Sequence, residues 1–124
     1  MSVLLDTNIL TRAAQPGRPV YRDTLDALDV LRQRGELLCI VPQNLYEFWV
    51  VATRPLSANG MGMGPSQAAT ELSSLKKLFH FLNDTPSVYT EWERLVSQYA
   101  VSGKPAHDAR VYVEPFGHRD EIFA

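Results

Sequence analysis

Two short apolar runs, separated by a segment with leucines at helical spacing, constrain the fold of this chain most strongly. We expect strands over residues 2–5 and 37–41, and between them a helix over about residues 21–34 with leucines on one face. Apolar runs of this length are typical of strands that are buried on both faces of a parallel sheet. The order strand, helix, strand therefore predicts an α/β fold with a parallel central sheet covered by helices.

The middle of the chain continues this alternation. Apolar residues at helical spacing predict a second helix over about residues 44–53. A glycine-rich loop at 54–65 follows, and we expect another helix at 66–77. The apolar segment 78–82 predicts the third strand.

The next helix has clear boundary signals. Thr85 is a good N-cap, Pro86 suits the first helical position, and Gly103 follows the expected end. A further element begins at residues 104–108. The expected order is β-α-β-α-α-β-α-α, and 124 residues fit a single domain over residues 1–124.

Composition excludes several classes of protein. The chain carries 12 Lys and Arg and 14 Asp and Glu, without a basic run, so no broad nucleic-acid surface is expected. The single cysteine, Cys39, excludes an intramolecular disulfide. No apolar stretch reaches the roughly 20 residues of a membrane span, so we expect no membrane association and a cytoplasmic protein.

Three carboxylates occupy positions that local packing does not explain. Asp6 ends the first strand, Glu47 lies in a helix that is otherwise almost wholly apolar, and Asp108 lies near the start of a late helix. In a parallel α/β fold these elements can converge on one edge of the sheet. Clustered carboxylates repel unless a cation neutralises them or they share a proton. With oxygen ligands only, the expected cation is Mg²⁺, with Mn²⁺ as an alternative.

A hard divalent cation held in this way suits the hydrolysis of phosphodiester bonds. Thr7 and Asn8 follow Asp6 directly and are candidates for orienting its carboxylate or a bound water. A nucleotide-binding α/β domain is disfavoured, because no glycine fingerprint follows the first strand.

Structural roles remain as alternatives for each carboxylate. Asp6 and Asp108 can act as helix caps. A salt bridge can satisfy Glu47, and the chain offers three candidate partners for it: Arg12, Arg54 and Arg110.

Three segments together resemble the first acidic motifs of PIN domains, most closely those of VapC-type toxins. They are residues 3–10, containing Asp6-Thr7-Asn8, residues 44–49 around Glu47, and residues 106–110 around Asp108. The resemblance covers about residues 2–112. It implies a three-layer α/β/α fold and a Mg²⁺-dependent endoribonuclease. The ligands and catalytic residues would be Asp6, Glu47 and Asp108.

The resemblance also implies partners: an RNA substrate, a cognate antitoxin and a second copy of the chain in a homodimer. In the family, the glycine-rich loop borders the substrate groove or a partner surface. Arg54, at the start of that loop, is therefore a candidate phosphate contact.

The last residues depart from the family pattern. Pro115 and Gly117 interrupt the helix expected after Asp108, and the chain has no room for the usual fourth acidic position. We therefore expect residues 113–124 to form an atypical tail, as after truncation or alteration of the gene. The fourth and fifth strands would be missing and the edge of the first strand exposed. The alternative function is a catalytically impaired binding module for an antitoxin or RNA, or a chain without function.

Overall fold

A four-stranded parallel sheet organises the computed structural model, which describes residues 2–105 and the backbone of residues 121–123. The spatial order is β3-β2-β1-β4. The strands are β1 (Ser2–Leu5), β2 (Leu37–Ile40), β3 (His80–Phe81) and β4 (Glu121–Phe123). The first three confirm the predicted strands: β1 has the predicted bounds, and the ends of β2 and β3 differ from them by at most two residues.

β1 lies in the interior of the sheet and is paired on both sides. Its Leu4 is in register with Cys39 of β2 and with Ile122 of β4. The predictions that the fourth strand is missing and that the edge of β1 is exposed are therefore wrong. Ile122 and Phe123 have high strand propensity, and a strand of three residues suffices to pair with β1. The described residues contain no fifth strand.

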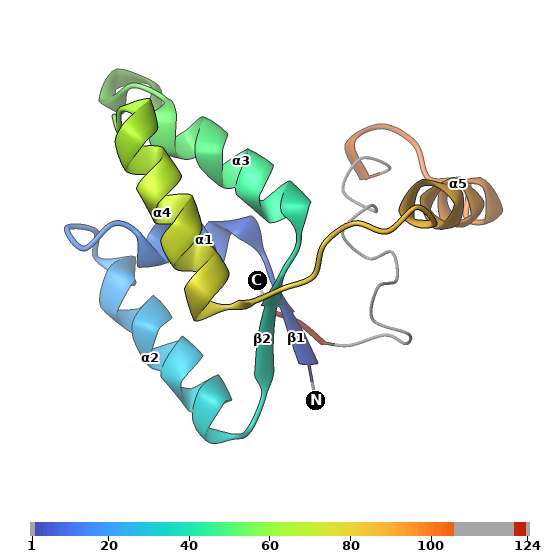
Figure 1. Ribbon diagram of the computed structural model, residues 1–124, viewed down its shortest axis with the longest axis horizontal. Helices are drawn as coiled ribbons and strands as arrows, with labels where there is room; N and C mark the ends of the chain where they lie inside the picture. Colours follow the sequence, from blue (N-terminus) through green and yellow to red (C-terminus); the bar gives the residue numbers. More distant parts are fainter. Residues whose placement is uncertain (1, 106–120, 124) are drawn as a thin grey trace.

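Helices lie on both sides of the sheet. In Figure 1, α1 to α4 lie together on one side and α5 lies on the other, which gives the three-layer α/β/α arrangement predicted from the sequence. The helices are α1 (Thr7–Ala13), α2 (Val20–Gln33), α3 (Pro42–Thr53), α4 (Pro65–Leu78) and α5 (Val88–Gln98), with a 3₁₀ turn, η1, at Leu56–Ala58. None of these helices is long and apolar enough to cross a membrane.

Two helices near the candidate site differ from the prediction. The short α1 was not predicted, because seven residues carry too little of a helical stripe to be recognised. α3 begins at Pro42 rather than at residue 44. Proline suits the first turn of a helix, where its missing N–H has no intrahelical partner in any case. In both cases a single residue, Asp6 or Val41, separates the carboxyl end of the strand from the helix.

The core lies between the sheet and the α1–α4 layer. β1 and β2 contribute side chains that are almost fully buried, and α3 contributes Phe48, which is completely buried. The cluster comprises Val3, Leu5, Ile9, Leu10, Leu28, Leu31, Leu38, Ile40, Leu45, Phe48, Ala52, Ala68, Leu75 and Phe79. This core anchors β1, which Asp6 directly follows, and α3, which carries Glu47.

The strand order places Asp6 at a particular point of the sheet. From β1 the chain proceeds to β2 and then β3 in one direction, whereas β4 lies on the opposite side of β1. Ligands of open α/β sheets bind at such a switch in strand order, beside the carboxyl ends of the strands. Asp6 directly follows the carboxyl end of β1 and therefore lies at the switch point.

The loop after α3 folds back onto the end of that helix. Backbone N–H groups of Met61 and Met63 donate to the carbonyl oxygens of Val51 and Ala52, at 3.0 and 2.8 Å. These bonds satisfy carbonyl groups that the end of a helix otherwise leaves unpaired. Gly60 is buried in this loop, and a Cβ at its position would overlap the backbone carbonyl of Arg54.

We expect Gly60→Ala to destabilise the protein by about 2 to 3 kcal/mol, because the added methyl group meets backbone that must move. Thermal unfolding measures this change. Gly17→Ala is the matched control, since a Cβ there has no neighbour within 4 Å and the melting temperature should hardly change. Equal melting temperatures for the two variants would contradict the observed loop packing.

Candidate functional site

Asp6 caps the helix that follows β1. Its Oδ1 accepts a hydrogen bond of 2.9 Å from the backbone N–H of Asn8, and its backbone conformation is extended, as in an N-cap. The capping role proposed as an alternative is therefore present. It uses one carboxylate oxygen, and among the described residues the second oxygen has no hydrogen-bond donor. Capping and cation binding are thus compatible at Asp6.

Glu47 is half-buried on α3 and is held by two donors. The hydroxyl of Thr7 donates to its Oε1 at 2.6 Å, and Nε2 of Gln43 lies 3.4 Å from its Oε2. Glu47 is an acceptor in both contacts, as a carboxylate must be. Within the described part of the chain it forms no ion pair, so neither Arg12 nor Arg54 satisfies it by a salt bridge. Arg110 lies outside the described residues.

Thr7 connects the two acidic residues. It follows Asp6 in the chain, and its hydroxyl contacts Glu47 on α3, 40 residues away in the sequence. The carboxyl end of β1 and the first turns of α3 therefore meet at one place. The sequence suggested that Thr7 orients Asp6 or a water, whereas its contact in the structure is to Glu47. Asn8 is exposed and contributes its backbone N–H to Asp6.

Sequence reasoning missed Asn44, which holds this arrangement together. Its side chain is 1% exposed and bonds three groups. Oδ1 accepts from the backbone N–H of Val41 at 2.8 Å. Nδ2 donates to the carbonyl of Leu5 at 3.2 Å and to the hydroxyl of Thr7 at 3.1 Å. A polar residue in the first turn of an apolar helix was the available signal, since a buried amide needs partners.

The bonds from Asn44 set the direction of the chain of hydrogen bonds. The amide nitrogen of Asn44 donates to the oxygen of Thr7, and the Thr7 hydroxyl proton is then directed at Glu47. The Glu47 carboxylate is consequently oriented from the first residue of α1 and from its own helix together. An oriented carboxylate is preorganised for binding a cation.

The other predicted site residues are not part of this cluster. Asp108 lies outside the described residues, so its predicted position beside Asp6 and Glu47 stays a prediction. Arg54 is seven residues beyond Glu47, about 10 Å along the helix axis, and has no polar contact with the cluster. Among the described residues, no three His, Cys, Asp or Glu side chains gather in the manner of a complete metal site. The described cluster supplies two carboxylates.

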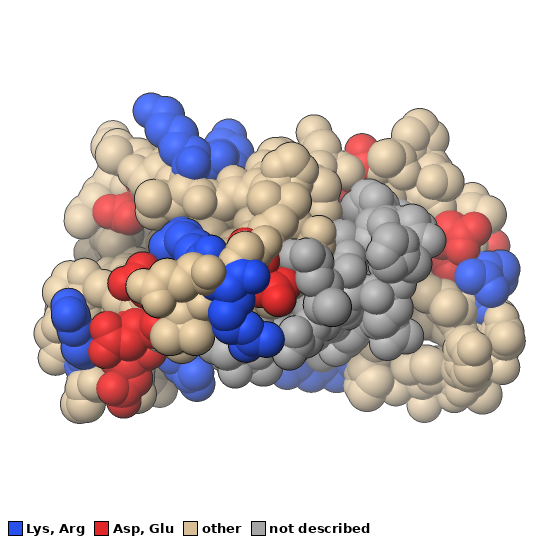
Figure 2. Space-filling model, turned by 90° about the horizontal axis from the view of Figure 1, so that it is seen from below, with Lys and Arg blue, Asp and Glu red and all other residues tan. Residues whose placement is uncertain are grey.

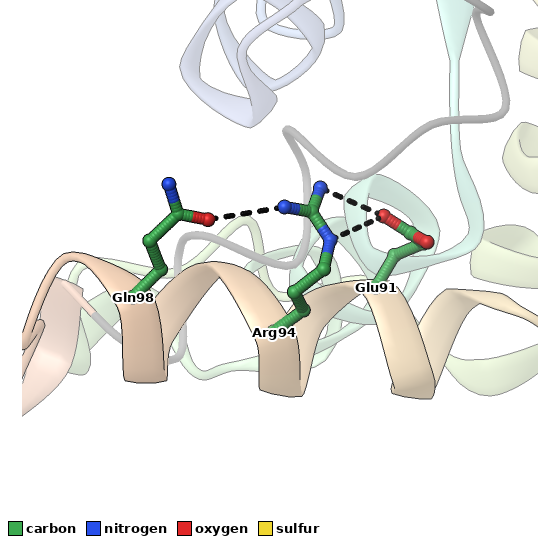
Figure 3. A network of polar contacts seen from close by, with 3 residues as sticks. All are labelled: Glu91, Arg94 and Gln98. Carbon is green, nitrogen blue, oxygen red and sulfur yellow. Dashed lines mark hydrogen bonds and ion pairs between the residues drawn. The ribbon is translucent and has the colours of Figure 1, made fainter.

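The surface carries no broad basic field on the face seen in Figure 2. Blue basic and red acidic side chains are interspersed over the coloured part of that face. On α5, Arg94 is engaged within its own helix: it pairs with Glu91 at 3.0 Å and donates to Gln98 at 3.1 Å (Figure 3). Both observations agree with the even charge distribution of the sequence, which favours a local site for any nucleic acid.

Comparison with known proteins identifies the fold. No family model matches the chain, and no curated protein matches it. A chain in the crystal structure of VapBC2 from Rickettsia felis, bound to a DNA fragment from their promoter, superposes with a TM-score of 0.56. The two chains are 16% identical, and the superposition covers 90% of this chain and 78% of that one. The protein therefore has the α/β/α fold of a chain in a VapBC complex, in agreement with the PIN-like fold predicted from its motifs.

Proposed function

We propose that this protein is a Mg²⁺-dependent endoribonuclease that hydrolyses RNA phosphodiester bonds and is the toxin component of a toxin–antitoxin pair. One observation carries the proposal: the Thr7–Glu47 contact brings the residue after Asp6 against a second carboxylate, at the switch point of the sheet. Ligand sites of α/β folds form at this point. Asp6 and Glu47 thus come from segments that meet at this point, and a bound cation would offset the repulsion between their carboxylates.

The residues present fit a hard divalent cation. Asp6 and Glu47 offer carboxylate oxygens, and no sulfur or imidazole ligand takes part in the described cluster. Mg²⁺ prefers such oxygens and is commonly bound through one or two carboxylates with water in its other positions. Asp108 is the proposed third ligand. Mn²⁺ has the same ligand preference and is the convenient probe.

The hydrogen bonds of the cluster underlie the role that we propose for each residue of the site. A bound divalent cation supplies Lewis-acid activation and neutralises charge on the phosphate. Asp6 and Glu47 hold that cation, and Thr7 keeps the Glu47 carboxylate in a fixed orientation. Arg54 directly follows the end of α3, and we propose it as a contact to a phosphate more distant from the reacting bond.

The proposed partners come from the fold and from the motifs. The chain shares its fold with a chain of a VapBC complex, and we propose a cognate antitoxin and a homodimer for this protein as well. We also propose that it acts in the cytoplasm, where its RNA substrate is found.

Incubation of the purified protein with total RNA tests the activity. We expect cleavage that requires Mg²⁺, stops when EDTA is added and resumes with excess Mn²⁺. Saturable Mn²⁺ binding in calorimetry without any cleavage would instead select the alternative, a catalytically impaired binding module. Cleavage that persists in EDTA would contradict the role given to Asp6 and Glu47.

A further inference from the structure

The side-chain oxygen of Gln43, Oε1, is buried and lacks a hydrogen-bond donor among the described residues. The residue as a whole is 3% exposed. A buried acceptor without a donor is energetically costly, and such groups in folded proteins point to a bound species or a functional role. This glutamine lies one turn before Glu47, on the same face of α3.

The orientation of the amide follows from its neighbour. Nε2 lies 3.4 Å from Oε2 of Glu47, and a carboxylate can only accept. Exchanging the amide oxygen and nitrogen would place two acceptors together, so the nitrogen faces Glu47. Oε1 belongs to the same rigid amide group as this nitrogen, so it is close to Glu47, and it is closed off from bulk solvent.

We propose that Gln43 is a positioning residue of the cation site, a role that rests on the proposed function. Its nitrogen holds Glu47. When the cation binds, the side chain shifts so that its carbonyl oxygen, which water does not reach in the cation-free structure, accepts a hydrogen bond from a water molecule of the hydrated cation. Mg²⁺ and Mn²⁺ retain several waters when few protein ligands bind them, and those waters are strong donors. Binding of the cation therefore supplies the donor that Oε1 lacks.

This assignment makes two predictions of opposite sign for Gln43→Met, which keeps the length of the side chain. Without cation, the melting temperature should equal or exceed that of the wild type, because a buried unsatisfied acceptor is removed. The affinity for Mn²⁺, measured by calorimetry, should fall about tenfold or more, as for other residues that orient metal ligands. Gln67→Met, at an exposed position on α4, is the matched control and should change neither quantity.

Gln43→Glu provides a second test, which remains informative if Gln43→Met folds poorly. It keeps acceptor oxygens but places a second carboxylate against Glu47, so the cation-free protein should lose stability. Mn²⁺ should then raise its melting temperature by more than it raises that of the wild type. A rise no larger than in the wild type would overturn the assignment.

Two further outcomes of the Gln43→Met experiment decide between explanations. Unchanged Mn²⁺ affinity, or a melting temperature that falls along with the affinity, would show that Gln43 only packs, and would overturn its role while leaving the proposed function intact. Failure of the wild-type protein itself to bind Mn²⁺ would instead refute the metal site, and the role of Gln43 with it.

Discussion

Asp6→Asn is expected to reduce Mg²⁺-dependent RNA cleavage by about 100-fold or more while the protein stays folded. Residues that merely orient metal ligands change metal affinity by about 10- to 100-fold, so loss of a ligand itself should have at least that effect. The fold should survive because asparagine is as good an N-cap as aspartate and can accept the same bond from Asn8. Initial cleavage rates and thermal unfolding measure the two effects separately.

Asp6→Ala is the informative companion to this variant. It removes the cap as well as the charge, so it should lose about 1 kcal/mol of stability in addition to the activity. If Asp6 were only a cap, Asp6→Asn would cleave RNA as the wild type does and Asp6→Ala alone would be impaired. That pattern would remove Asp6 from the catalytic site.

Asn44→Ala is expected to destabilise the protein by about 2 to 4 kcal/mol, because it leaves buried partners without their hydrogen bonds. The N–H of Val41 loses its acceptor, and the carbonyl of Leu5 and the hydroxyl of Thr7 lose a donor. Chemical denaturation measures the change. The variant should also bind Mn²⁺ more weakly, since the Thr7 hydroxyl is no longer directed at Glu47.

Asn83→Ala is the matched control for this truncation. Asn83 is exposed, and its side chain accepts one bond, from the adjacent backbone N–H of Asp84. Surface substitutions of this kind usually change stability by less than about 0.5 kcal/mol. A similar free energy of unfolding for both variants would show that the bonds of Asn44 contribute little.

Periodicity in the sequence predicted the parts of the fold that depend on burial. The apolar run at 37–41 became β2, because it has the length of a strand and is followed by Pro42. The stripe within 21–34 became α2, because its apolar residues recur at helical spacing. The position of Glu47 in an apolar helix likewise indicated that its carboxylate needs polar partners. Its polar partners are Thr7 on α1 and Gln43 on α3.

Contacts between distant residues were beyond such reasoning. Asn44 bonds Thr7 and Leu5 across 37 and 39 residues, and the sequence around Asn44 does not predict these partners. β4 was missed for a similar reason: three residues carry little periodicity, and their pairing with β1 depends on tertiary structure. The direction of the Thr7 bond, toward Glu47 rather than Asp6, also requires the arrangement of strands and helices.

A calorimetric titration of the wild-type chain and of Asp6→Asn with Mn²⁺ tests the central claim most directly. We predict one saturable site in the wild type and binding at least about tenfold weaker in the variant, because a ligand is lost. The absence of saturable binding in the wild type, or equal affinities for the two proteins, would contradict a cation site formed by Asp6 and Glu47.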